Sequence, residues 1–283
     1  MLGLLTASAA LHVPTAPAGV AGRRQALALG VSLALNTLGP QPAPAAEADE
    51  QVALYFGAGC FWHVQHEFTL HEQATLARRG AEISATSGYA GGTRLGDKSR
   101  VCYHNMQQLA DYGALGHGEV VQVTIPASAV GSFSEKFFGI FGKQGIRHDP
   151  QDRGGEVRAR TVTRATRIIH LPAPDTNHAP AQYRSLLGLK GGMKSPYFPT
   201  IREAAANSPM LLAAGRGDEG DTIKDKKVLV YDSDAFPFYP AELYHQFHND
   251  FQGAPYGSAY NALQTVRAKA GAIGETGCPE RMF

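Results

Sequence analysis

Short apolar runs alternate with mixed segments of helical composition along much of the chain. The run Val52–Phe56 stops at a glycine turn, and the segment that follows it, from Phe61 to Arg79, favours a helix. A second strand is predicted at Glu119–Ile125, and the phenylalanine spacing within Gly131–Gly142 predicts a second helix. A third strand is expected at Lys226–Tyr231. Strands separated by helices over this length indicate an α+β or α/β layered domain.

The first 46 residues differ in composition from the rest of the chain, because all 25 acidic residues lie at or beyond Glu47. The pair Arg23-Arg24 precedes an apolar run at 26–35 and a proline-rich stretch with small residues, which is the order of an export signal. That run is too short to span a bilayer. We therefore predict a targeting peptide at 1–46, resembling a transit segment followed by a twin-arginine signal, and a single domain at 47–283. The expected location is a plastid, in the thylakoid lumen; an ordinary secretory signal and a secreted protein are the alternative.

Composition, net charge and cysteine count exclude several classes of protein and of binding partner. With 43% hydrophobic and 18% charged residues, the chain can bury a sizeable core, which excludes a disordered protein. The net charge of +1 gives no basic excess for a phosphate backbone, so nucleic acid is not an expected partner. We expect no membrane span and a monomer. Three cysteines are too few for a disulfide scaffold or a closed zinc site.

Cys60 has the sequence context of a reactive cysteine. It follows a glycine turn and stands at the predicted start of a helix, whose positive end stabilises a thiolate. The only tryptophan of the chain, Trp62, lies two positions further on. An aromatic wall beside a nucleophile suits a small apolar group such as a methyl on sulfur. A buried structural cysteine is the alternative interpretation.

Five motifs occur in the order in which one known family carries them, and they extend over nearly the whole mature chain. On these motifs the sequence resembles the A-type peptide methionine sulfoxide reductases, as a divergent member. The resemblance implies an α+β fold, a two-layer sandwich of a mixed sheet with helices and long irregular segments. It also implies reduction of methionine S-sulfoxide, in proteins or free. The motifs are Gly59–Trp62, Gly88–Gly92, Gly116–Val121, Tyr183–Ser185 and Phe238–Gln246.

The resemblance also assigns roles to residues. Cys60 would attack the sulfoxide sulfur and become a sulfenic acid, and Glu119, with a raised pKa, would protonate the oxygen. Tyr183 would donate a hydrogen bond to that oxygen, with Asp152 in support. The implied substrate-binding residues are Phe61, Trp62, Tyr239, Glu242 and His245.

The chain departs from the family pattern at several positions. His63, Val64 and Gln65 stand where the family usually has Gly and then Glu. The family's Asn-Pro-Thr-Tyr segment is missing, and either Tyr103 or Tyr112 could replace its tyrosine. Of the other two cysteines, Cys278 is expected to resolve the sulfenic acid on Cys60, and Cys102 is expected to be a bystander.

We expect no cofactor and no metal, with a thioredoxin-like protein or another dithiol as the reductant. Two histidine pairs, His63/His66 and His245/His248, have helical spacing, but no zinc-type quartet accompanies them. The alternative function is a catalytically weak or silent protein that binds oxidised methionine peptides.

A stretch at 157–182 separates Asp152 and Glu156 from Tyr183 and has no helical or strand periodicity. Joining Glu156 to Tyr183 restores the five-residue spacing of the family motif. The segment also begins with Val and ends with Gln, whose codons can carry the terminal bases of an intron. We therefore predict a disordered insertion that arose as a retained intron; an evolved surface loop is the alternative.

Overall fold

The computed structural model describes residues 49–147, 182–217, 219–220, 225–251 and 253–280. The chain divides into two units, 1–46 and 47–283, and the fold below belongs to the second. The predicted targeting peptide lies outside the described residues, as does the predicted insertion except for Gln182. None of the helices in the described ranges has the length and apolar character needed to cross a bilayer.

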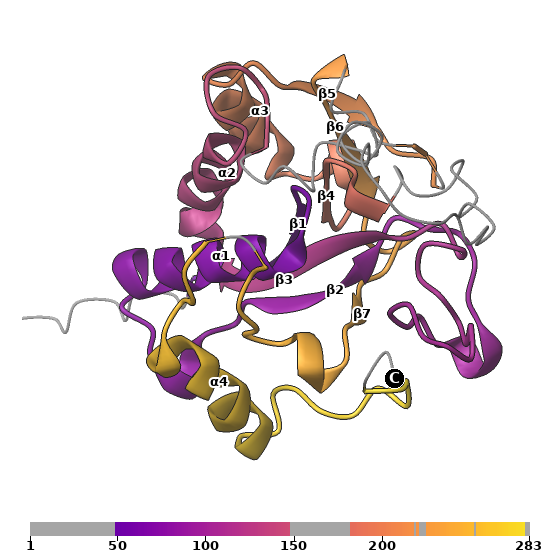
Figure 1. Ribbon diagram of the computed structural model, residues 1–283. Helices are drawn as coiled ribbons and strands as arrows, with labels where there is room; N and C mark the ends of the chain where they lie inside the picture. The colour runs from indigo at the N-terminus through magenta and orange to yellow at the C-terminus, as the bar shows by residue number, and fades with distance from the viewer. Residues whose placement is uncertain (1–48, 148–181, 218, 221–224, 252, 281–283) are drawn as a thin grey trace, which may run out of the picture. The chain divides into compact units, whose positions relative to one another are not determined.

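The described strands form one mixed sheet of seven strands, in the order β5-β6-β4-β1-β3-β2-β7 (Figure 1). β1 lies at its centre and pairs antiparallel with both β3 and β4. β2 joins β3 to the short edge strand β7, again antiparallel, whereas β4, β6 and β5 run parallel. The strands are β1 Gln51–Gly57, β2 Thr86–Ala90, β3 Gly118–Pro126, β4 Leu186–Leu189, β5 Leu211–Ala214, β6 Lys227–Asp232 and β7 Tyr239–Pro240.

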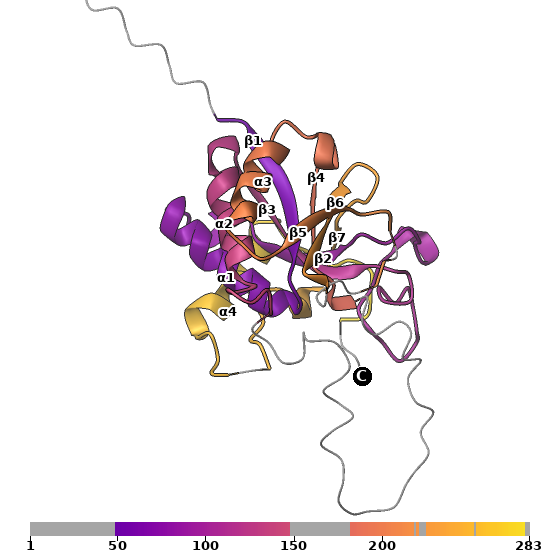
Figure 2. The same cartoon turned by 90° about the horizontal axis from the view of Figure 1, so that it is seen from above.

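Four α-helices are described, and α1, α2 and α4 lie on one side of the sheet in both ribbon views (Figures 1 and 2). α1 packs on β1, β2 and β3 and also contacts α2, which in turn packs against α3. The helices are α1 Phe61–Thr75, α2 Val130–Gly139, α3 Phe198–Ala206 and α4 Ser258–Lys269. Short 3-10 turns lie at Gly80–Glu82, Asp97–Ser99, Ala127–Ala129, Gly192–Lys194 and Leu243–His245.

Alternation along the central strand distributes side chains to two layers. Leu54 and Phe56 belong to the large core under the helices, whereas Tyr55 belongs to a second cluster on the other face. Phe236 and Phe238, from an irregular segment, pack on that second cluster. The fold is therefore α+β, with helices on one face of a mixed sheet and irregular chain on the other, as expected.

Most of the predicted elements are present with shifted ends. The strands predicted from Val52, Glu119 and Lys226 are β1, β3 and β6, and Cys60 is the N-cap of α1. The first predicted helix extends to Arg79, but α1 ends at Thr75, since the chain turns at Ala77 with a φ of 54°. The turn brings the chain back to α1, where the Arg78 guanidinium and the Ser84 backbone amide donate hydrogen bonds to the buried carboxylate of Glu72.

Candidate active site

A strand–turn–helix unit presents Cys60. β1 ends at Gly57, and Gly59 adopts a φ of 91°, a left-handed conformation that costs a glycine little. The turn places Cys60 at the N-cap of α1, half-buried, at the positive end of the helix dipole. Cys60 is the one cysteine outside a disulfide.

Glu119, from the start of β3, lies against the same helix end. Its carboxylate accepts a hydrogen bond from the backbone amide of Phe61 (2.9 Å) and another from the Tyr112 hydroxyl (3.0 Å). The side chain is 1% exposed, and burial raises its pKa to about 7 even though both hydrogen bonds favour the ionised form. A carboxyl group that holds its proton near neutral pH is thus bonded to the residue that follows Cys60.

Aromatic rings form a wall around the start of α1. The Phe61 ring lies 5.3 Å from His245 and 6.3 Å from Tyr103, and those two rings are themselves 4.1 Å apart. Trp62 is covered by His248 at 4.3 Å and by Phe251 at 4.8 Å. These rings give the start of α1 an apolar surface, against which Cys60 packs.

Two nitrogens in this wall are buried without a hydrogen-bond partner among the described residues, Nε1 of Trp62 and Nδ1 of His245. Burial lowers the pKa of His245 to about 3, so the ring is neutral at physiological pH. An indole N–H and a neutral imidazole side by side can hydrogen-bond a polar group of a bound molecule without adding charge to the site.

A second buried carboxylate supports the wall from behind. Glu242 accepts a hydrogen bond from the Tyr89 hydroxyl (2.8 Å) and one from the backbone amide of Tyr103 (2.7 Å). Burial raises its pKa as well. Because Glu242 begins the turn that carries His245, these bonds hold two sides of the wall together.

Tyr103 and Tyr112, the two candidates to replace the missing family tyrosine, have different positions. The Tyr112 ring is fully buried and its hydroxyl is engaged with Glu119. Tyr103 is half-buried within the wall, and its pKa is raised by burial and by the nearby charges of Glu119 and Cys60. Tyr103 is therefore the tyrosine that lies near both the carboxyl and the thiol. Tyr183 is half-buried and lies close enough to raise the pKa of Tyr112.

An Asp–His pair borders this tyrosine cluster. Nδ1 of His104 lies 2.5 Å from the Asp111 carboxylate, and its Nε2 lies 3.2 Å from the side-chain oxygen of Gln182. Burial lowers the pKa of His104, but the Asp111 carboxylate outweighs burial and the net shift is upward. The His104 charge in turn lowers the pKa of Glu119.

The divergent residue Gln65 has a structural task. Its amide donates to the carbonyl of Ala85 (3.1 Å) and to the side chain of Gln246 (3.0 Å), while its oxygen accepts from the backbone of Phe247 (2.6 Å). A glutamate in ionised form could not make the two donations. Gln65 thus ties α1 to the segment that follows His245.

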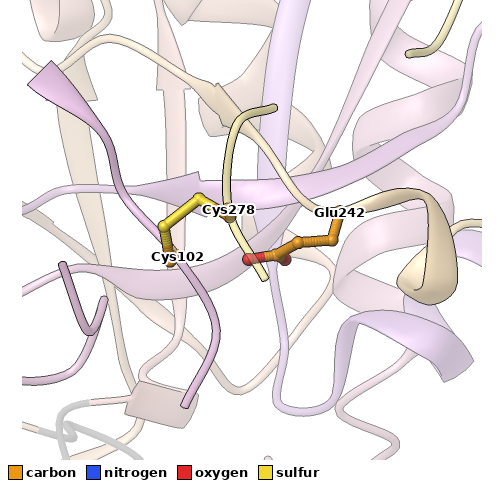
Figure 3. A group of neighbouring side chains, drawn as sticks. All are labelled: Cys102, Glu242 and Cys278. Carbon is orange, nitrogen blue, oxygen red and sulfur yellow. A yellow bond between two sulfur atoms is a disulfide. The ribbon is translucent and has the colours of Figure 1, made fainter. Parts of the chain in front are cut away.

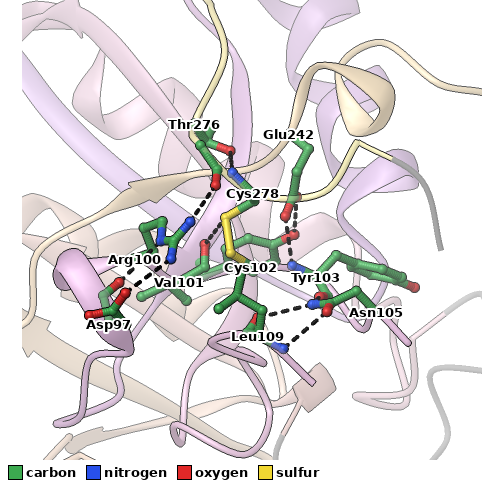
Figure 4. The surroundings of a disulfide bond; sticks show 12 residues. Asp97, Arg100, Val101, Cys102, Tyr103, Asn105, Leu109, Glu242, Thr276 and Cys278 are labelled. Carbon is green, nitrogen blue, oxygen red and sulfur yellow. Dashed lines mark hydrogen bonds and ion pairs between the residues drawn. A yellow bond between two sulfur atoms is a disulfide. The ribbon is translucent and has the colours of Figure 1, made fainter. Parts of the chain in front are cut away.

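The cysteine pairing differs from the prediction. Cys102 and Cys278 form a disulfide, with Cα atoms 5.6 Å apart (Figures 3 and 4). The role of Cys102 as a bystander is wrong, and the pairing present is not the predicted one between Cys278 and Cys60. Cys102 is fully buried and forms a β-bridge with Asp111. The C-terminal tail reaches Cys102 only in the folded chain, because Cys278 is 176 positions away in sequence. Glu242 lies next to the two sulfur atoms, and a disulfide offers no thiolate to a metal.

The predicted site residue Tyr239 has surroundings other than the aromatic wall. Tyr239 lies in β7, where its ring meets His117 at 5.3 Å, and it borders a cavity of about 560 Å³ with Arg100 and the tail segment Gly271–Thr276. Asp152 lies outside the described residues.

Part of the chain is similar in sequence to a curated protein. No family model matches the chain. A curated relative, the peptide methionine sulfoxide reductase MsrA of Geobacter sulfurreducens, is 36% identical over 75 residues, a stretch that covers 26% of this chain and 36% of that protein. The chain resembles the A-type methionine sulfoxide reductases. It spans about a third of the length of this relative.

Two solved structures are also similar. Methionine sulfoxide reductase A of Corynebacterium diphtheriae is 17% identical with a TM-score of 0.36, covering 77% of this chain and 92% of that one. Mxr1 of Saccharomyces cerevisiae in its reduced form is 18% identical with a TM-score of 0.33, covering 69% and 82%.

Sequence reasoning missed several residues that hold the site together. Tyr89 lies within the second motif and Gln246 ends the fifth. The motifs therefore include both residues but assign neither of them a role. His104, Asp111 and Glu280 lie outside every motif, and only the folded chain brings them to the site.

Proposed function

We propose that this protein reduces methionine sulfoxide, with Cys60 as the nucleophile and Glu119 as the proton donor. The observation that carries the proposal is the buried Glu119 carboxyl, with a pKa near 7, bonded to the first amide of the helix that Cys60 caps. Reduction of a sulfoxide needs both groups, because the oxygen must gain protons as its bond to sulfur breaks.

Substrate binding would use the aromatic wall. The rings of Phe61 and Trp62 offer an apolar surface to the S-methyl group, and Tyr103 closes the opposite side. The sulfoxide oxygen would lie toward the Tyr103 hydroxyl and the Glu119 carboxyl, while the buried nitrogens of Trp62 and His245 offer hydrogen bonds to the polar parts of the substrate.

The chemical step balances without a cofactor. The Cys60 sulfur attacks the sulfoxide sulfur, and Glu119 donates a proton to the oxygen as that sulfur is reduced. The oxygen passes to Cys60, so the products are methionine and a sulfenic acid on Cys60. A dithiol such as a thioredoxin-like protein then supplies two electrons and two protons, which releases water and restores the thiol.

A single-turnover experiment tests the proposal. The full-length protein is mixed, without added reductant, with peptides that carry either the S or the R sulfoxide of methionine, and methionine is quantified by chromatography. We expect methionine only from the S epimer, and none from Cys60→Ser. Cys60→Ser that still forms methionine would exclude Cys60 as the nucleophile. Binding of oxidised peptide without any methionine would instead indicate the silent binding protein.

The acid role has a matched control. Glu119→Gln removes the buried proton donor, whereas Glu135→Gln changes an exposed glutamate on α2. We expect loss of turnover in the first variant and parent-like turnover in the second.

A further inference from the structure

The C-terminal tail is fastened at two sides of the site. On one side, Cys278 is bonded to Cys102 (Figure 4). The Arg100 guanidinium also donates a hydrogen bond to the carbonyl of Gly277 (2.7 Å). On the other side, the Glu280 carboxylate accepts a hydrogen bond from the backbone amide of Tyr244 (3.0 Å) and a longer one from Leu243 (3.4 Å).

Each of the two segments to which the tail is bonded carries one aromatic ring of the wall. Cys102 directly precedes Tyr103, and Glu280 holds the turn Leu243–His245. Glu242 links the two segments, since it accepts from the Tyr103 amide and lies beside both sulfur atoms (Figure 3). The tail therefore contacts both of the segments that carry the Tyr103–His245 pair, and Glu242 connects these segments to each other.

We infer that the Cys102–Cys278 disulfide and Glu280 form a clasp of positioning residues, which holds Tyr103 and His245 against Phe61 for substrate binding. The inference rests on the proposed function, in which this wall receives the sulfoxide. The clasp stays closed during turnover, and its cysteines do not exchange with Cys60.

A closed clasp determines the class of reductant. Of the three cysteines in the chain, only Cys60 lies outside the disulfide, so its sulfenic acid meets no second thiol of the same chain. An outside thiol must condense with it, which forms a mixed disulfide and releases water. A second outside thiol then attacks that disulfide, which restores the Cys60 thiol and yields the oxidised reductant.

Product stoichiometry separates the clasp from an internal relay. In a relay, Cys278 would condense with the sulfenic acid and Cys102 would then displace Cys60, so that a fully reduced chain could reduce two sulfoxides before it stops. With a clasp, the chain reduces one sulfoxide whether the tail disulfide is closed or has been opened beforehand.

The first experiment counts methionine per chain. Protein as isolated, and protein reduced with dithiothreitol and then freed of it, are each given excess S-sulfoxide peptide, and the Cys60 product is identified by mass spectrometry. We expect one methionine per chain from both samples and a sulfenic acid on Cys60. Two per chain from the reduced sample, or a disulfide that includes Cys60, would overturn the inference. No methionine from either sample would contradict the proposed function instead.

The second experiment tests positioning without removing a disulfide. Glu280→Gln weakens the hold on the Tyr244 amide, and Glu275→Gln, on the exposed part of the tail, is the matched control. We expect Glu280→Gln to raise KM and lower kcat/KM by roughly 10-fold, within the range that misplaced binding groups cost. The fluorescence of Trp62, the only tryptophan, should change with it, because His245 stacks on that ring at 5.7 Å.

Cys278→Ser extends the test to the disulfide. It should change KM and the Trp62 fluorescence in the same direction as Glu280→Gln, while the rate at which a small alkylating reagent modifies Cys60 stays the same. If both variants keep the parent KM and fluorescence, the tail has no positioning role.

Discussion

The two ends of α1 each border a buried glutamate, yet the two carboxyl groups have different partners. Glu72, in the last turns of the helix, is 0% exposed and accepts from the Arg78 guanidinium at 2.7 Å and from the amide of Ser84 at 2.8 Å. Glu119, at the first turn, is 1% exposed and accepts only from neutral donors in the contacts described, the Phe61 amide and a tyrosine hydroxyl.

The comparison shows that burial alone does not decide what a carboxyl group does. A cation and several donors make Glu72 an anchor for the turn that ends the helix. Neutral donors compensate less for lost hydration, so Glu119 keeps its proton up to about pH 7. One glutamate therefore stabilises the fold, and the other is available for proton transfer.

The largest expected effect comes from removing the proton at Glu119. Glu119→Gln keeps an oxygen that can accept from Phe61, so the fold should persist. The single-turnover rate with S-sulfoxide peptide should fall by about 10²- to 10⁴-fold, the usual contribution of a positioned acid. Stopped-flow quenching with product analysis measures it. A rate close to that of the parent would exclude the acid role.

The matched substitution at the C-terminal end of α1, Glu72→Gln, should lower the stability of the fold without changing the turnover rate. Glu72→Gln leaves Arg78 facing a neutral amide and should lower the free energy of unfolding by about 3 kcal/mol, the cost of breaking a buried pair. Urea unfolding followed by circular dichroism gives this value. The folded variant should turn over at the parent rate; slow turnover in fully folded protein would break the distinction between the two glutamates.

The pH dependence sharpens the same distinction. Because the acid must be protonated, the single-turnover rate should fall as pH rises through about 7, the pKa of Glu119. Stability has the same sign: the folded pKa lies above the unfolded value near 4.5, so this contribution is complete below about 4.5 and is lost by up to about 3 kcal/mol as pH rises through 7. Both dependences should be missing in Glu119→Gln. A parent rate that stays constant across this range would show that no such proton is transferred.

A smaller effect is expected from the Asp–His pair. Asp111→Asn removes the carboxylate that raises the pKa of His104, so His104 loses its charge at lower pH. Without that charge, the pKa of Glu119 rises and the falling limb of the rate profile should move to higher pH by less than about one unit. The pH–rate profiles of Asp111→Asn and the parent, measured side by side, check the direction; a shift to lower pH would exclude this coupling.

The sequence predicts the parts of this account that depend on neighbours along the chain. The apolar run of β1, the glycine turn and the helix start are enough to place Cys60 at the N-cap of α1. The family motifs then bring Glu119 to the same place. Strands β2, β4, β5 and β7 are not predicted, because they are short. Gly188 in β4 also has the sequence character of a loop residue, although the Tyr55 ring fills the space beside it.

The remainder depends on contacts between distant residues. Cys102 and Cys278 are 176 positions apart, and nothing near either residue in the sequence identifies its partner. The same holds for Gln65 and Gln246, whose amides meet only because α1 and the segment after the turn Leu243–His245 pack together. A divergent position can therefore keep a structural role that its family motif does not reveal.

The most direct test of the central claim observes the Glu119 proton itself. Infrared difference spectra between the parent and Glu119→Gln, recorded from about pH 5 to about pH 9, isolate the carbonyl band of this one protonated carboxyl group. We expect a band that is present at the acidic end and disappears with a midpoint near pH 7. A band already missing at the acidic end would show that Glu119 is ionised like an ordinary glutamate, and would contradict its role as the proton donor beside Cys60.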